Sequence, residues 1–274
     1  MVLILFFSCK TNNRTNSNTM KANKAISGVN YSQKSKEETP SNNKKDDFTK
    51  KAIETQEKQR LIEILLPSTY RDWENKNPAD DLNEAWLELH QKEEKYYIAK
   101  ADYTIERGED ECTGYATKTI KSKNKTLLFI KHPNLKIGQV YASYFDKDKI
   151  CPNEKMSFNY KDIIYIINAE GDVVSDEEVH TDNGLERYCV VENYKLYIST
   201  NEKNESLFLE QKSFNDTFTK LLFVGDIDSD EKLDFIFESN RHYEQERVFL
   251  YLSSEADKSE IIKKVAEISV DFSC

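Results

Sequence analysis

Short apolar runs separated by polar turns dominate the chain after Leu61. About ten such runs, rich in Val, Ile, Phe and Tyr, follow one another at spacings of about 8 to 15 residues. They include GQVYASYF, RYCVVENYKLYIS, ESLFLEQ, KLLFVGD, KLDFIFE and RVFLYLSS. Because β-branched and aromatic residues favour half-buried strands, the pattern predicts a mainly β fold, with antiparallel sheets in a sandwich or a partly closed barrel. No repeat of 20 to 50 residues is found, so a full propeller is not expected.

Two segments have helical rather than strand periodicity. Apolar residues recur at helical spacing between Asp46 and Leu66, and Pro67 follows at once. This pattern predicts an N-terminal helix over residues 46–66 whose last turns pack on the β-rich domain. Residues 256–268 show similar spacing but run into the alternating sequence ISVDF, so helix and strand are both open there.

The first eight residues, MVLILFFS, are apolar or small and precede Cys9. Eight residues are too few to span a bilayer, which takes about 20. The run ending in Phe-Ser-Cys resembles a bacterial lipobox, which implies lipid attachment at Cys9. An ordinary apolar start with a chance cysteine is the alternative.

Residues 9–45 are rich in Asn, Ser, Thr and Lys and contain few apolar side chains. Such a segment cannot bury enough apolar surface to order itself, so we expect a disordered polar tether or simply a floppy terminus. The expected organisation is a signal-like segment over 1–8, the tether over 9–45, a helix over 46–66 and a single β-rich domain over 67–274.

Apart from Cys9, the chain has four cysteines at wide spacing and no Cys-x-x-Cys pair. Zinc sites generally need close ligand pairs, so two disulfides in an oxidising compartment are the better prediction. The candidates are Cys112, Cys151, Cys189 and Cys274, and all three pairings are open. Together with the anchor at Cys9, this predicts a bacterial cell-envelope protein, periplasmic or at the surface.

The net charge of −10 bears on possible partners. Binding to nucleic acid needs a basic face for the phosphates, and no stripe of Lys and Arg stands out in the sequence. We therefore expect no nucleic-acid partner and contact with a membrane only through the lipid anchor.

The clearest chemical signal lies in LLFVGDIDSDEKLDFIFES, residues 221–239, where two apolar runs flank an acidic loop. Aspartates occupy positions 1, 3, 5 and 9 of the loop: Asp226, Asp228, Asp230 and Asp234. Each close pair of carboxylates costs about 1 kcal/mol at ~4 Å even in water, and a divalent cation removes that cost. Calcium accepts six to eight oxygens at flexible geometry, so the loop predicts a calcium site with these four carboxylates and the carbonyl of Lys232 as ligands. A solvated acidic turn is the alternative.

Two positions separate the loop from an EF-hand. Position 12 is Phe237 instead of a bidentate Glu, and both flanks read as strands. Position 6 is Glu231 instead of Gly, so a residue with a Cβ has to take the sharp turn. We expect a dissociation constant of about 0.1 to 1 mM, as in extracellular modules.

The segment GDIDSDEKLDFIF resembles the calcium loop of FG-GAP and VCBS-type repeats, in which D-x-D-x-D-G-x-x-D precedes an apolar strand. The resemblance implies the same five ligands, and a single copy implies a local site instead of a propeller. The longer run from Gly225 to Cys274 also resembles the end of uncharacterised bacterial lipoproteins.

No catalytic motif accompanies this loop. The four histidines are dispersed, and neither a nucleophile elbow nor a Gly-rich phosphate loop is present. Ser122 and Lys125 have Ser-x-x-Lys spacing but lie in a turn. His242 and Tyr243 follow the strand after the acidic loop, so they either approach the metal end of the sheet or belong to a plain turn.

The sequence thus predicts an exported, lipid-anchored β-rich protein with one structural calcium ion, which acts as a binding or scaffolding module. No catalytic residue is predicted. A cell-envelope hydrolase acting on glycans and a surface adhesin or inhibitor are the alternatives, and no protein or glycan partner is defined.

Overall fold

The computed structural model describes residues 62–181 and 184–274, which form strands β1 to β16 and one short 3-10 helix, η1 (Pro78–Asp81). The mainly β class is therefore confirmed. Residues 46–61 of the predicted helix lie outside the described residues. Its last residues form strand β1 (Glu63–Leu65), so the helix prediction is wrong for this part.

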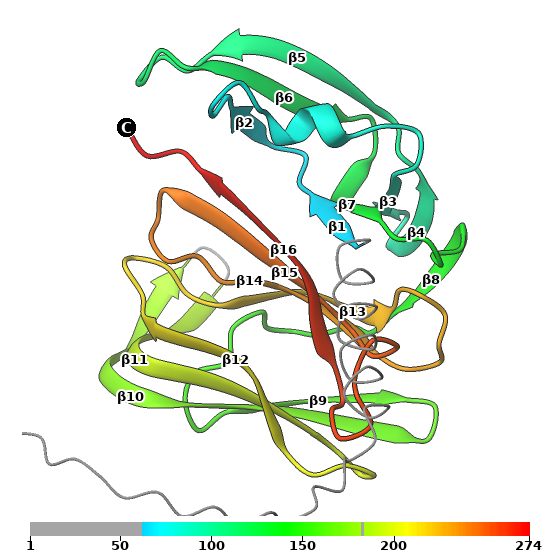
Figure 1. Ribbon diagram of the computed structural model, residues 1–274. Coiled ribbons are helices and arrows are strands. Elements are labelled where there is room, and N and C mark those ends of the chain that lie inside the picture. The colour runs from blue at the N-terminus through cyan, green and yellow to red at the C-terminus, as the bar shows by residue number, and fades with distance from the viewer. Residues whose placement is uncertain (1–61, 182–183) are drawn as a thin grey trace, which may run out of the picture. The chain divides into compact units, whose positions relative to one another are not determined.

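The largest sheet has nine strands, all antiparallel to their neighbours. Its order is β1, β7 (Lys125–Lys131), β3 (Leu87–Lys92), β4 (Lys95–Lys100), β8 (Gly138–Ala142), β13 (Lys220–Asp226), β14 (Asp234–Glu238), β15 (Gln245–Leu252) and β16 (Lys263–Asp271). The edge strands β1 and β16 lie close together, so the sheet is barrel-like and nearly closed (Figure 1). The architecture is thus a partly closed barrel and not a propeller. The formation of β16 settles the end of the 256–268 segment as strand.

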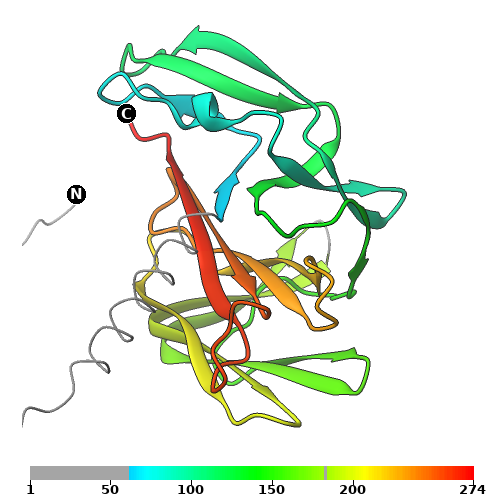
Figure 2. The same ribbon diagram turned by 45° about the vertical axis from the view of Figure 1, so that its right-hand side comes forward.

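Two smaller sheets accompany the barrel-like sheet. The three-stranded sheet has the order β2 (Thr69–Arg71), β6 (Ala116–Ser122) and β5 (Tyr103–Glu109). The four-stranded sheet has the order β12 (Ser206–Ser213), β11 (Gly184–Thr200), β10 (Ile163–Thr181) and β9 (Lys155–Tyr160). The long β10–β11 hairpin is its central part, with β13 to β16 above it (Figure 2).

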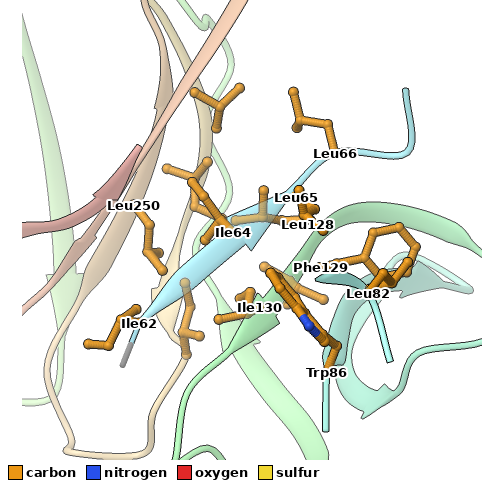
Figure 3. Packing of buried hydrophobic residues seen from close by; sticks show 14 of the residues in the cluster. Ile62, Ile64, Leu65, Leu66, Leu82, Trp86, Leu128, Phe129, Ile130 and Leu250 are labelled. Atoms are coloured by element: carbon orange, nitrogen blue, oxygen red, sulfur yellow. The ribbon is translucent and has the colours of Figure 1, made fainter. Parts of the chain in front are cut away.

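The first hydrophobic core lies on the inner face of the barrel-like sheet (Figure 3). Trp86, Phe129 and Phe223 are its largest fully buried side chains. Ile64 and Leu65 of β1 are both buried, and Ile64 pairs with Ile130 of β7. The apolar residues that suggested a helix therefore serve a short strand, because pairing with β7 buries side chains on both of its faces.

The second core lies between β13 to β15 and the four-stranded sheet. Tyr165 and Phe158 of the four-stranded sheet meet Phe235 of β14 edge to face, with ring centroids 6.3 and 6.2 Å apart. Aromatic pairs in this geometry add to the hydrophobic contribution of burial.

Strand β14 separates the two cores and is buried on both faces. Phe235 and Phe237 belong to the second core, whereas Ile236 between them belongs to the first. Alternating side chains point to opposite faces of a strand. Because both faces are covered, the sequence LDFIF shows no alternation of apolar and polar residues.

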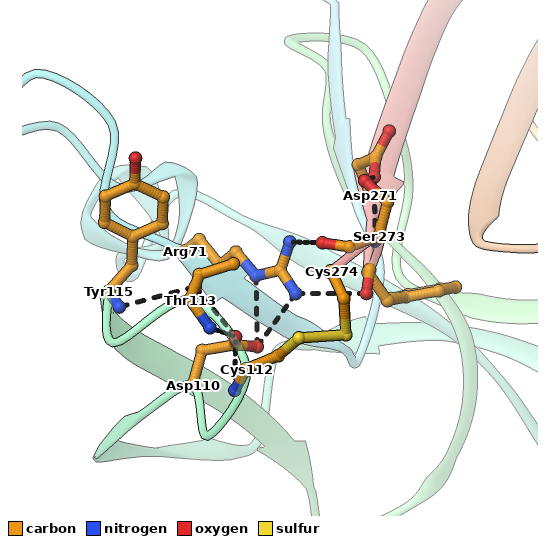
Figure 4. A network of polar contacts seen from close by, with 9 residues as sticks. Arg71, Asp110, Cys112, Thr113, Tyr115, Asp271, Ser273 and Cys274 are labelled. Carbon is orange, nitrogen blue, oxygen red and sulfur yellow. Dashed lines mark hydrogen bonds and ion pairs between the residues drawn. A yellow bond between two sulfur atoms is a disulfide. The ribbon is translucent and has the colours of Figure 1, made fainter.

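The structure pairs the four cysteines as Cys112–Cys274 and Cys151–Cys189. The first bond holds the C-terminus to the turn between β5 and β6, and Arg71 strengthens this connection (Figure 4). The guanidinium of Arg71 donates to the carbonyl oxygens of Ser273 at 2.6 Å and Phe272 at 3.0 Å.

Two disulfides are typical of an oxidising, exported compartment. Within the described part of the chain, no helix combines the length and the apolar character that a membrane span needs.

Strands β8 and β13 join the two halves of the nine-stranded sheet through two residue pairs, Gly225 with Ala142 and Asp226 with Tyr141. A Cβ atom on Gly225 would lie 2.0 Å from the backbone oxygen of Tyr141 and 2.6 Å from the Phe223 ring. Only glycine permits so close an approach of the two backbones.

We therefore predict that Gly225→Ala lowers the free energy of unfolding by about 2 kcal/mol, since backbone has to move. The melting temperature should fall by about 4 to 8 °C for a domain of this size. Gly108→Ala is the matched control, because its added Cβ meets only the side-chain oxygen of Thr117, at 3.0 Å. Equal melting temperatures for Gly225→Ala and the parent protein would contradict the prediction.

Candidate metal centre

The turn between β13 and β14 brings together three of the four aspartates in the acidic loop. Asp226 ends β13, Asp234 begins β14 and Asp228 lies between them. One carboxylate oxygen from each lies within 4.8 Å of the others. Oxygens bound to one calcium ion at about 2.3 to 2.6 Å lie at most about 5 Å apart, so this aspartate trio has a spacing that fits a single cation.

Asp234 is fully buried, and backbone and hydroxyl groups hold its carboxylate. One oxygen accepts hydrogen bonds from the backbone N–H of Ser253 at 2.8 Å and from its hydroxyl at 3.2 Å. The other accepts from the N–H of Ile227 at 2.7 Å. These donors hold the carboxylate in place where water cannot solvate it.

Asp226 is held from the loop itself and from the neighbouring sheet. Its two oxygens accept the backbone N–H groups of Asp230 at 3.1 Å and Glu231 at 3.2 Å. The hydroxyl of Tyr160, at the end of β9, donates to the same carboxylate at 2.9 Å. Burial, with the Asp226 carboxylate as a second cause, raises the pKa of Tyr160, so this hydroxyl remains a donor at neutral pH.

Asp228 is the aspartate whose hydrogen bonding is incomplete. Its Oδ2 accepts the hydroxyl of Ser254. Its Oδ1 is buried and has no hydrogen-bond partner among residues 62–181 and 184–274. An unsatisfied buried acceptor costs about 1 to 3 kcal/mol. A cation within the trio would satisfy this oxygen, so the donor set fits a metal ion.

The raised pKa values of two aspartates in the trio also favour a bound cation. Burial raises the pKa of Asp228, and the charges of Asp230 and Asp226 raise it further. Burial also raises the pKa of Asp234 well above the ordinary aspartate value, and Asp228 and Asp230 add to the effect. A divalent ion reverses this balance, because it favours the ionised form of every carboxylate around it.

The other predicted ligands lie at the rim of the loop. Asp230 is outside the trio, and its carboxylate accepts the Ser253 hydroxyl at 2.8 Å and the Lys232 backbone N–H at 2.9 Å. Ligation by Asp230 and by the Lys232 carbonyl stays a prediction. Glu231 has φ +71° and Ser229 has φ +64°, so position 6 does adopt the left-handed conformation for which glycine is favoured.

The structure decides between the two alternatives for His242 and Tyr243, which belong to the turn between β14 and β15. His242 and Tyr243 follow the end of β14, whereas the acidic loop precedes its start, so these residues lie at the opposite end of the strand from the aspartate trio. The Nε2 atom of His242 instead lies 3.7 Å from Oδ2 of Asp271. Ser122 lies beside Glu88 and Thr126 as a hydrogen-bonding partner, which agrees with the turn reading of Ser-x-x-Lys.

Tyr160, Ser253 and Ser254, which were not predicted as site residues, hold the carboxylates from outside the loop. Tyr160 is 66 residues from its partner Asp226, and Ser254 is 26 residues from Asp228. No local pattern marks them, because they meet the loop only after the sheets have packed.

No protein-family model, curated protein or solved structure matches the chain. The fold and the site therefore define its class directly: a mainly β, disulfide-bonded protein with a partly closed barrel and an acidic trio that can hold a metal ion.

We predict that Asp228→Asn acts in opposite directions with and without metal. In chelator it should raise the free energy of unfolding by about 1 kcal/mol, because an amide N–H can donate to the neighbouring carboxylates where an unpaired oxygen now lies. In millimolar calcium it should be less stable than the parent. Urea unfolding in the two buffers measures both values.

Asp146→Asn is the control for this experiment, because Asp146 is an exposed aspartate outside the trio. It should behave as the parent in both buffers. An Asp228→Asn protein that gains as much stability from calcium as the parent would argue against the site.

Proposed function

We propose that the chain is an exported, lipid-anchored binding or scaffolding module in which one calcium ion fastens the β13–β14 turn. The observation that carries the proposal is the buried, unpaired Oδ1 of Asp228 within a trio of carboxylates. A bound cation would coordinate this oxygen, which has no hydrogen-bond partner among the described residues. The likeness of GDIDSDEKLDFIF to the calcium loops of FG-GAP and VCBS-type repeats agrees with this proposal.

The chemistry of the donors favours calcium over other ions. The trio offers only carboxylate oxygens, which are hard ligands, and no His or Cys joins it within the described residues. Zinc prefers nitrogen and sulfur ligands. Magnesium demands near-ideal octahedral geometry and tends to retain its waters, whereas calcium tolerates the irregular geometry of a loop.

The position of the trio supports a structural role for the ion. Its carboxylates are hydrogen-bonded to Ser253 and Ser254, which follow β15, and to Tyr160, at the end of β9. Lys161 in the turn after β9 forms an ion pair with Glu231 of the loop at 2.6 Å. An ion there would therefore connect the barrel-like sheet with the four-stranded sheet, and the burial of Asp234 keeps it away from solvent.

Export and anchoring rest on separate features. The two disulfides agree with an oxidising compartment. Cys9 follows an apolar run and precedes a polar segment with the composition of a tether. The signal-like segment and the tether lie outside the described residues, so the anchor rests on sequence alone.

Calcium binding is tested by thermal melting in calcium and in chelator. At ten times its dissociation constant, an ion that binds only the folded state adds about 1.4 kcal/mol. The melting temperature should rise by about 3 to 6 °C, and magnesium at the same concentration should raise it less.

The double variant Asp228→Ala/Asp230→Ala should lose this response. Asp146→Ala/Asp148→Ala is its matched control, because it removes a second Asp-x-Asp pair from an exposed loop and should retain the response. An unchanged midpoint of the parent protein on chelation would rule out calcium as a structural ion.

The anchor is tested separately by Cys9→Ser in a bacterial host. The variant should lose incorporation of labelled palmitate and move from the membrane fraction to the soluble fraction, because the thiol is the point of attachment. Asn13→Ser in the same segment should keep both. Palmitate labelling that survives Cys9→Ser would show that Cys9 is not the lipidated residue.

A further inference from the structure

A cavity of about 460 Å³ opens at the end of β14 opposite the acidic loop. It is bordered by the Cys151–Cys189 disulfide, the loop before β13, the loop between β14 and β15, and the C-terminal tail. Its size is within the range of about 300 to 1,000 Å³ that small-molecule sites occupy. The cavity shares no residue with the acidic loop.

Three aromatic side chains around this cavity remain open to solvent. Tyr188 of β11 is 57% exposed, Tyr243 is 61% exposed, and Phe272 in the tail is also exposed. The ammonium group of Lys149 lies 5.5 Å from the centre of the Tyr188 ring. Aromatic rings left uncovered around one hollow offer flat apolar faces to a ligand.

The charges that line the cavity are balanced. The cationic residues are Lys149, Arg187 and Lys220, and the acidic residues are Asp216, Glu238 and Glu246. Arg187 is already paired with Asp176 at 2.5 Å and Glu154 at 3.1 Å, and Lys220 lies 3.5 Å from Glu238. With equal numbers of both signs, the cavity has no excess charge to select an anion or a cation, so it suits an uncharged ligand.

Two polar side chains in the cavity wall can form hydrogen bonds with a ligand. Gln245 is only 9% exposed, and its side-chain oxygen accepts the Arg241 N–H at 3.1 Å. The carboxylate of Glu246 makes no hydrogen bond or ion pair within the described residues. Their side chains point to opposite faces of β15, and both residues line the cavity where the strand begins. Amide and carboxylate groups match hydroxyl groups, which both donate and accept.

The surroundings of Glu246 favour a ligand that donates hydrogen bonds to its carboxylate. Glu238 pairs with Val248 across the β14–β15 ladder, so Glu246 is its diagonal neighbour on the same face. Burial raises the pKa of Glu246, with the charge of Glu238 as a second cause. Hydrogen-bond donors of a ligand would therefore stabilise the ionised form of this half-buried carboxyl group, which lies next to a second one.

We propose that this cavity binds a short, uncharged saccharide. Sugar rings combine an apolar C–H face with a rim of hydroxyl groups, and the cavity offers exposed aromatic rings together with the Gln245 side chain and the unpaired carboxylate of Glu246. The inference rests on the proposed function in so far as it supplies the ligand of a binding module. It does not depend on calcium, because β13 places the two sites about 20 Å apart.

The test uses the purified protein and saturation-transfer NMR with a panel of neutral sugars. The probes are glucose, galactose, N-acetylglucosamine, cellobiose, maltose, lactose and diacetylchitobiose, with inorganic phosphate and spermidine as charged competitors. We expect saturable binding of at least one sugar that neither competitor displaces. Tyr243→Ala and Glu246→Gln should each weaken it about tenfold, through loss of a stacking face and of an acceptor.

Tyr144→Ala is the matched control, because Tyr144 is another exposed tyrosine and does not line the cavity. It should bind as the parent does. Absence of binding by every sugar, displacement by phosphate or spermidine, or equal affinity of Tyr243→Ala and Tyr144→Ala would each overturn the inference. Repeating the titration in chelator separates the two proposals: sugar binding without a calcium response would overturn only the calcium site, and the reverse only the saccharide site.

Discussion

Burial of the β13–β14–β15 ladder on both faces is the constraint on which the rest of the structure depends. Ile236 packs into the core of the barrel-like sheet, while its neighbours Phe235 and Phe237 pack against the four-stranded sheet. A strand covered on both sides cannot shift its register by one residue without exchanging every side chain between the two cores. This ladder therefore fixes the position of both ends of the β13–β14 hairpin.

The two ends of the β13–β14 hairpin differ in the charged groups that they bring together. At one end, carboxylates are crowded and partly buried, and Asp228 retains an oxygen without a partner. At the other, Lys220 and Glu238 oppose each other in a cavity whose charges are balanced. The first arrangement suits a bound cation, the second a neutral polar ligand. The same ladder of strands holds both ends.

Local patterns in the sequence were sufficient for the class of fold and for most of the acidic site. Asp226, Asp228 and Asp234 are close in sequence and lie on one turn, so their spacing alone predicted that they would meet. The cavity was not predicted, because Tyr188 and Phe272 come from segments far apart in sequence. The predicted helix was wrong at Glu63–Leu65 because helical spacing of apolar residues also serves a short strand that is buried on both sides.

The sequence by itself determined the strand-rich composition, the acidic loop and the even set of cysteines available for disulfides, since each depends on residue type and local spacing. Only the tertiary structure decided the pairing of Cys112 with Cys274, the hydrogen bond from Tyr160 to Asp226, and the cavity around Gln245. These features join residues that are distant along the chain. Their contacts arise only when the sheets pack, because packing brings together groups whose separation in sequence carries no signal.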